Sequence, residues 1–246
     1  GILELPDGDY EFEDWLDDDG ISDDPVRIHV KLQIKADALT ADFSGSNAQV
    51  LGPLNARISA ARAALYYVAK IVIDPDLATC AGAYRPLTVI APEGSLLQAR
   101  FPAAIGNANI LTDQRIVDVL LGALHAVAPQ RVCAACSGEM NLVNVGGIDS
   151  RNGRYYNYVE TYGGGQGALF DRDGQDGIHT HLTNTRNTPV EVIEANYPLE
   201  VLRYGLLPGT GGDGQYRGGC GIERIIRCLS DRTTLTVGSD RRKFQP

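Results

Sequence analysis

The residues most suited to chemistry lie in one polar stretch, Asp176 to Glu191. It contains two His, two Asn and an Arg among several Thr, with few apolar side chains. Such a stretch cannot drive hydrophobic collapse, and if it is buried every donor and acceptor needs a partner. We therefore expect either a solvated loop or the lining of a site.

The imidazoles of His179 and His181 are two residues apart, so on an extended segment they point to the same side. That arrangement suits acid–base work, a substrate oxygen or a metal, with Asp173 and Asp176 near enough to orient a ring. Hydrogen-bonded structure is an equally open interpretation. We predict catalytic roles for His179 and His181 and no metal site in this chain.

Arg186 stands between two asparagines, Asn184 and Asn187. Its guanidinium suits bidentate binding of a carboxylate or phosphate, although a salt bridge to Glu191 or Glu194 explains it as well. We predict that Arg186 is catalytic and that both asparagines bind substrate.

A glycine-rich turn, Gly163-Gly164-Gly165-Gln166-Gly167, follows a predicted strand that carries Glu160. Consecutive glycines allow close approach of the backbone to a ligand or to another strand. Neither a P-loop lysine nor the dinucleotide-binding spacing is present. We predict that Gly163, Gly164, Gly165 and Glu160 bind substrate, while a purely structural turn remains the alternative.

The five cysteines include one pair, Cys133 and Cys136, with redox or zinc spacing. No second pair accompanies it, so buried structural thiols are the preferred interpretation. An odd cysteine count without a signal peptide predicts reduced thiols and a cytoplasmic protein. The net charge of −9 argues against nucleic acid, and no apolar run is long enough to span a membrane. We interpret the acidic run Asp17-Asp18-Asp19 as a solvated turn.

Periodicity predicts the elements that position these residues. Period-two alternation indicates strands in the first 45 residues, and helical spacing indicates two helices, one over 55–73 and one capped by Thr112 and ended by Pro129. The predicted strands are 10–15, 26–34, 39–43, 87–91, 95–99, 132–145, 155–162, 199–207, 222–228 and 233–237. Two helices among so many strands, without strict alternation, predict an α+β (mixed α/β) fold with large antiparallel-rich sheets.

Several strings, in order along the chain, resemble the hydantoinase B/oxoprolinase (HyuB-like) family. They are Leu5–Tyr10, Asp17–Gly20, Asp42–Ser46, Gly52–Asn55, Ala91–Leu97, Gln114–Asp118, Glu160–Gly165, Asp176–Glu191, Tyr197–Leu199 and Gly211–Gly221. The resemblance implies one HyuB-like region over 1–246, the C-terminal half of such a subunit, with a subdivision into a strand–helix part, 1–130, and a mainly β part, 131–246.

The resemblance further implies a function. Family members are ATP-dependent hydrolases of cyclic amides such as 5-oxoproline, hydantoins or lactams, and related members carboxylate ketones. ATP is bound by a kinase-like HyuA-type partner subunit in a hetero-oligomer, and a divalent metal is associated with the N-terminal half. An alternative from another class is a scaffold that docks subunits, with all chemistry elsewhere.

Overall fold

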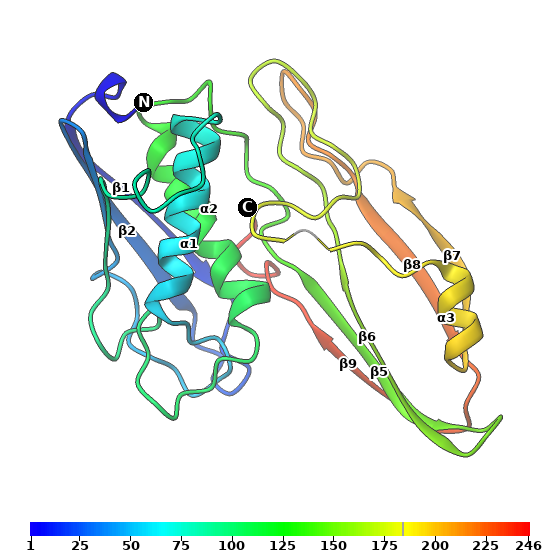
Figure 1. The fold of residues 1–246 in the computed structure, drawn as a ribbon. Coiled ribbons are helices and arrows are strands. Elements are labelled where there is room, and N and C mark those ends of the chain that lie inside the picture. The colour runs from blue at the N-terminus through cyan, green and yellow to red at the C-terminus, as the bar shows by residue number, and fades with distance from the viewer. Residues whose placement is uncertain (184) are drawn as a thin grey trace.

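A computed structural model describes residues 1–183 and 185–246. The fold is mixed α+β with antiparallel-rich sheets, as predicted (Figure 1). The strands are β1 (Gly8–Leu16), β2 (Val26–Lys35), β3 (Ala38–Asp42), β4 (Leu87–Ile90), β5 (Asn141–Asp149), β6 (Arg154–Tyr162), β7 (Leu199–Leu207), β8 (Gly221–Cys228) and β9 (Thr233–Gly238). The helices are α1 (Ile58–Val68), α2 (Asp113–His125) and α3 (Val190–Asn196), with a 3-10 turn η1 (Ile2–Glu4) and π-helical turns η2 (Ala69–Ile73) and η3 (Ala108–Thr112).

The N-terminal part is a sheet of order β1-β2-β3-β4 covered on one face by α1 and α2 (Figure 1). Only the β3–β4 pair is parallel. The alternation predicted for β2 is confirmed, since its apolar residues from Val26 to Ile34 are all buried while their neighbours are not. These side chains pack against the apolar stripes of both helices in one large core. The predicted helix over 55–73 appears as α1 and its continuation η2.

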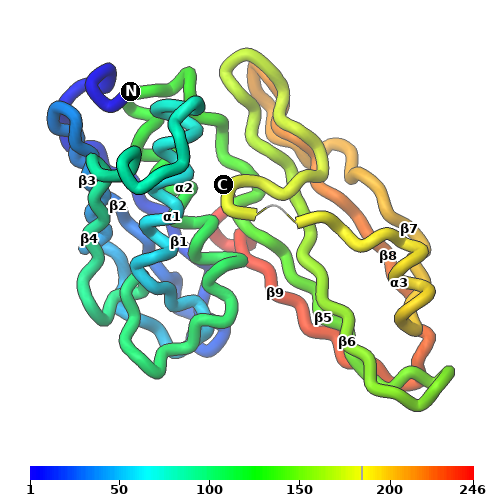
Figure 2. Tube along the Cα trace, viewed as in Figure 1, coloured from blue at the N-terminus to red at the C-terminus, as the bar shows by residue number. Residues whose placement is uncertain are grey.

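The C-terminal part consists of two smaller sheets, β6-β5-β9 and β7-β8 (Figures 1 and 2). A second core connects them through Val145, Tyr156, Tyr158, Ile193 and Leu199. Ile193 belongs to α3, a helix that the sequence analysis did not predict. The chain after β9 returns to the N-terminal part (Figure 2).

Buried ion pairs attach the chain segment after β9 to the N-terminal part. Arg115 on α2 is fully buried, and its guanidinium donates to Asp240 at 2.6 Å and to Asp14 at 3.0 Å. Arg241 pairs with Asp14 and Asp118, each at 2.8 Å. A buried charge is stable only when it is paired in this way, so these contacts fix residues 240–241 against β1 and α2.

The acidic run is not a solvated turn, because Asp17 is 2% exposed and Asp19 is 6% exposed. Asp17 accepts hydrogen bonds from the backbone N–H groups of Arg242, Lys243 and Phe244. Burial alone would raise the pKa of Asp17, but these donors outweigh it and lower the pKa. The prediction failed because the donors come from residues more than two hundred positions away.

Three local predictions are also wrong. Residues 95–99 form turns, because Leu96 N–H bonds to Asn47 and Ala99 N–H bonds to Ala56 instead of following one partner strand. Of the strand predicted over 132–145, only the part from Asn141 onward is extended in a sheet. Thr112 lies in helical conformation and its hydroxyl donates to the Leu54 carbonyl at 2.6 Å, so it does not cap α2.

Candidate functional site

A cavity of about 780 Å³ lies between the two C-terminal sheets. One wall carries Val143 and Val145 of β5 with Val237 of β9, and the other carries Ile222 and Ile226 of β8. The two glycine-rich loops close one end, including Gly163, Gly164 and Gly165. The cavity is therefore largely apolar, as small-molecule sites usually are, with few polar groups to orient a ligand.

Close approach of the backbone explains these glycines. A Cβ on Gly165 would lie 1.8 Å from the carbonyl oxygen of Gly219, a separation that no side chain tolerates. Gly164 forms an isolated bridge with Ile178, which attaches the loop to the polar stretch. Gly163 to Gly165 therefore form a structural turn that allows close backbone packing, one of the two interpretations of the sequence. They also line the cavity.

Glu160 on β6 is buried and forms an ion pair with Arg224 of β8, whose side chain is almost fully shielded from solvent. The Glu160 carboxylate accepts further hydrogen bonds from the Tyr158 hydroxyl and the Thr188 backbone N–H. The rings of Tyr204 and Tyr162 lie 4.0 Å and 5.2 Å from the guanidinium carbon, a cation–π arrangement. The pair joins the two sheets at the cavity wall.

Arg224 is a candidate site residue that the sequence analysis missed. It lines the cavity, its side chain is 1% exposed, and its Nε and Nη2 have no hydrogen-bond partner among the described residues. Buried N–H donors without acceptors are costly, and a negatively charged ligand group would satisfy them. The available signal was a charged pair, Glu223-Arg224, flanked by isoleucines in the segment Ile222 to Ile226.

Asn187 connects the polar stretch to both sheets. Its side-chain amide donates to the Thr161 carbonyl at 2.9 Å, and its Oδ1 accepts from the Tyr204 hydroxyl at 3.2 Å. Arg186 is exposed and forms no ion pair with a described carboxylate, so the salt bridge to Glu191 or Glu194 is absent there. The predicted Asn184 lies outside the described residues.

The two histidines do not share a side, contrary to the prediction. His181 has a positive φ of 55°, so the segment is not uniformly extended. His181 faces the N-terminal part, where its Nδ1 lies 3.3 Å from the Tyr67 hydroxyl and its Nε2 lies 3.9 Å from Asp118. His179 is instead close enough to Glu160 to sense its charge.

The environments of the two rings also differ. Burial lowers the pKa of His179 more than Glu160 raises it, which favours a neutral imidazole, and its buried Nε2 has no partner among the described residues. Burial lowers the pKa of His181 too, but Cys136 and Asp118 outweigh it and raise the pKa. The predicted orienting carboxylates, Asp173 and Asp176, bind Arg217 instead of either ring.

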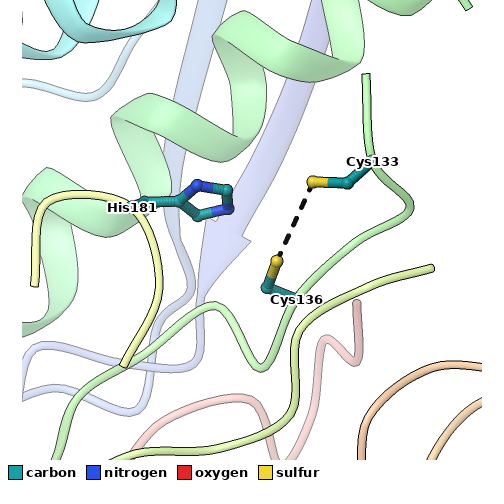
Figure 3. Close-up of side chains that lie close together, drawn as sticks. All are labelled: Cys133, Cys136 and His181. Carbon is teal, nitrogen blue, oxygen red and sulfur yellow. Dashed lines mark hydrogen bonds between the residues drawn. The ribbon is translucent and has the colours of Figure 1, made fainter. Parts of the chain in front are cut away.

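His181 meets the cysteine pair in space (Figure 3). The sulfur atoms of Cys133 and Cys136 are 4.0 Å apart, and one ligand atom from each of the three residues lies within 4.8 Å of the others. Cys136 is buried and Cys133 partly so. The hydrogen bond with Cys136 lowers the pKa of Cys133. No sequence spacing indicates this cluster, because Cys136 and His181 are 45 positions apart.

A family model described as Hydantoinase B/oxoprolinase matches residues 1–246. The chain belongs to the hydantoinase B/oxoprolinase family. An uncharacterized protein of Methanocaldococcus jannaschii is 43% identical over 221 residues, which cover 90% of this chain and 38% of that protein. The putative B component of a D-/L-hydantoinase from a Pseudomonas species is 34% identical over 256 residues, covering 100% of this chain and 42% of that one. This hydantoinase B/oxoprolinase chain thus spans less than half the length of both relatives.

Two solved structures share the fold. Acetone carboxylase in its nucleotide-free form superposes with a TM-score of 0.77 at 18% identity, covering 95% of this chain and 33% of that one. ATP-dependent caprolactamase from Pseudomonas jessenii gives a TM-score of 0.76 at 24% identity, covering 92% and 40%. None of the helices described for this family member has both the length and the apolar character needed to cross a membrane.

Proposed function

We propose that this chain is part of the B component of an ATP-dependent cyclic amide hydrolase, in which the cavity between the two C-terminal sheets receives a substrate activated by a partner subunit. Support comes from the family, from the relative named as a hydantoinase B component, and from the partly unsatisfied Arg224 on the cavity wall. A buried guanidinium with free N–H groups is suited to an anionic substrate group.

The proposed chemistry divides between the subunits. A HyuA-type, kinase-like partner binds ATP and phosphorylates the amide oxygen of a 5-oxoproline, hydantoin or lactam ring. Phosphorylation makes the ring carbon electrophilic enough for attack by water and adds the negative charge that Arg224 would hold. This division fits a sequence that has neither a P-loop nor a dinucleotide-binding fingerprint.

Within this proposal, the polar residues have distinct roles. Glu160 orients Arg224 through the buried ion pair, and Asn187 orients Tyr204 beside it. His179 is not among the residues that line the cavity, but Ile178 before it bridges Gly164 of the cavity loop, and we propose that its neutral imidazole accepts a proton from water during ring opening. Arg186 is exposed, outside the residues that line the cavity, and we propose that it binds a substrate carboxylate at the entrance.

The proposal is tested with the natural full-length protein co-expressed with its kinase-like partner. Ring opening and ADP release are measured for 5-oxoproline, hydantoin and caprolactam. Arg224→Lys and His179→Ala should each lower the rate of ring opening at least about 100-fold, which is the usual effect of removing one oriented charge or one acid–base group. Partner-dependent ADP formation should persist in both variants. Arg203→Lys on the neighbouring strand β7, where the Arg203 side chain is 59% exposed, serves as the control and should leave turnover unchanged.

A docking scaffold is the second candidate, because exposed apolar side chains lie on the C-terminal strands. Leu206 on β7 and Ile225 on β8 are 47% and 44% exposed and are not among the residues that line the cavity. A scaffold predicts that Ile225→Ser weakens co-elution of the two proteins in size-exclusion chromatography, while Arg224→Lys and His179→Ala leave turnover intact. Ring opening that survives both site variants would exclude the enzymatic proposal.

A further inference from the structure

The cluster of Cys133, Cys136 and His181 has a geometry that points to a ligand of its own (Figure 3). We propose that these residues form a zinc site with three protein ligands, next to the cavity between the C-terminal sheets, which Cys136 also lines. In a tetrahedral site with Zn–S bonds of about 2.3 Å, two thiolate sulfurs lie roughly 3.8 Å apart. The sulfurs here are already 4.0 Å apart, and the His181 ligand atom lies within 4.8 Å of both. Small side-chain rotations therefore complete the coordination.

The backbone holds the cysteine turn in place. The Ala134 N–H donates to the Ala168 carbonyl at 2.8 Å, and the Gly167 N–H donates to the Cys136 sulfur at 3.3 Å. This N–H would also donate to a metal-bound thiolate, whereas in the protein without metal the hydrogen bond with Cys133 and burial raise the pKa of the Cys136 thiol. Gly167 has no room for a side chain, since a Cβ there would lie 1.8 Å from the Ala134 carbonyl oxygen. The close approach of these two segments thus positions Cys136.

His181 is oriented from outside the cluster. Its Nδ1 lies 3.3 Å from the Tyr67 hydroxyl, and its Nε2 lies 3.9 Å from the Asp118 carboxylate. If Nε2 binds the metal, the hydrogen bond between Nδ1 and the Tyr67 hydroxyl fixes the tautomer. The positive φ of His181 turns its ring away from His179 and toward the cysteines.

The donor set selects the metal class. Two thiolates and one imidazole are ligands for Zn²⁺ and disfavour Mg²⁺ and Ca²⁺, which take oxygen ligands. Two thiolates also neutralise the charge of the ion, which suits the mostly buried position of the cluster. Asp118 is already paired with Arg241 at 2.8 Å, so it is better placed to orient His181 than to bind the metal itself.

The fourth coordination position of the proposed zinc ion would face a cavity. Cys133, His181 and Asp118 line a second cavity, of about 330 Å³, between α2 and the cysteine turn. Three protein ligands with an open fourth position are typical of zinc sites that bind water or an exchangeable ligand. We infer that this cavity admits that ligand.

The first test needs no variant. The natural full-length protein, purified with reductant, is treated with an alkylating agent with zinc present and after removal of metal by a chelator, and modified peptides are counted by mass spectrometry. Cys133 and Cys136 should be protected at least about tenfold by zinc, while exposed Cys80 reacts equally in both samples. Equal reactivity of Cys133 and Cys136 in both samples would overturn the proposal, as would a Cys133–Cys136 disulfide in the zinc-loaded sample.

The second test counts the metal. Cys133→Ser and Cys136→Ser should each lower zinc content by about one equivalent per chain relative to Cys80→Ser, as expected for loss of a thiolate ligand. Cobalt in place of zinc in the unmodified protein should give a thiolate charge-transfer absorption near ultraviolet wavelengths. A cobalt-loaded protein without that absorption, or unchanged zinc content in folded serine variants, would contradict the assignment.

Discussion

Replacing Glu160 by Gln probes how the two C-terminal sheets are held together. The substitution keeps the side-chain shape but removes the charge that compensates Arg224, whose side chain is 1% exposed. Leaving one member of a buried pair uncompensated costs about 3 to 5 kcal/mol, which corresponds to a roughly 150- to 4,000-fold larger opening equilibrium. We expect amides of β6 and β8 to exchange with solvent faster by that factor.

Native-state hydrogen exchange measures this opening strand by strand. Glu200→Gln is the matched control, because Glu200 and Arg227 pair at 2.9 Å across β7 and β8 but are 42% and 59% exposed. A solvent-exposed pair contributes less than about 1 kcal/mol, so exchange should change less than about 5-fold. Adding Arg224→Met to Glu160→Gln should recover part of the loss, since the buried charge is then gone. Equal exchange in the two glutamine variants would refute the reasoning.

Three further predictions follow from the packing. Burial raises the pKa of Glu139 from 4.5 to about 7. Between these two pH values the native state binds more protons than the unfolded chain, so the free energy of unfolding falls as pH rises. The midpoint of urea unfolding should therefore be lower at pH 8 than at pH 5, and Glu139→Gln should reduce this difference. Gly165→Ala should melt at a much lower temperature because its Cβ would meet the Gly219 oxygen, whereas Gly205→Ala has open space, and similar melting of both would contradict this account. Arg115→Lys should lower the free energy of unfolding by more than about 2 kcal/mol in urea titrations. The reason is that a single ammonium group cannot reach both carboxylates that the buried guanidinium joins. A decrease in the free energy of unfolding no larger than that of a surface substitution would disprove this account.

Local periodicity was sufficient wherever one face of an element is buried and the other is not. The alternation of Val26 to Ile34 predicted β2 and its buried face, and helical spacing predicted α1 and α2. These signals are local because a strand or helix must present its apolar side chains at a fixed period. The mixed α+β class follows from the order of the elements and is confirmed.

Features that depend on distant partners were not predictable. The Asp17 carboxylate is buried because its donors are the N–H groups of Arg242 to Phe244, and nothing near Asp17 indicates them. His179 and His181 were expected to act together, but the left-handed conformation of His181 sends the rings to different neighbours. Of the predicted site residues, Gly163 to Gly165 line the cavity, and Glu160 contributes through Arg224.

The contact between Glu139 and the backbone N–H of Asp240 has a consequence for folding during synthesis. It joins residue 139, just before β5, to residue 240, just after β9. The chain from β5 to β9 is therefore a long loop whose two ends both lie against the N-terminal core. Closing a loop of roughly 100 residues costs about 4 kcal/mol of chain entropy, and doubling its length would add only about 0.6 kcal/mol. Relatives can therefore lengthen these strands and loops at little thermodynamic cost. On the ribosome, however, Arg115 and Asp17 must wait for residues 240–244 to emerge before their buried charges are paired.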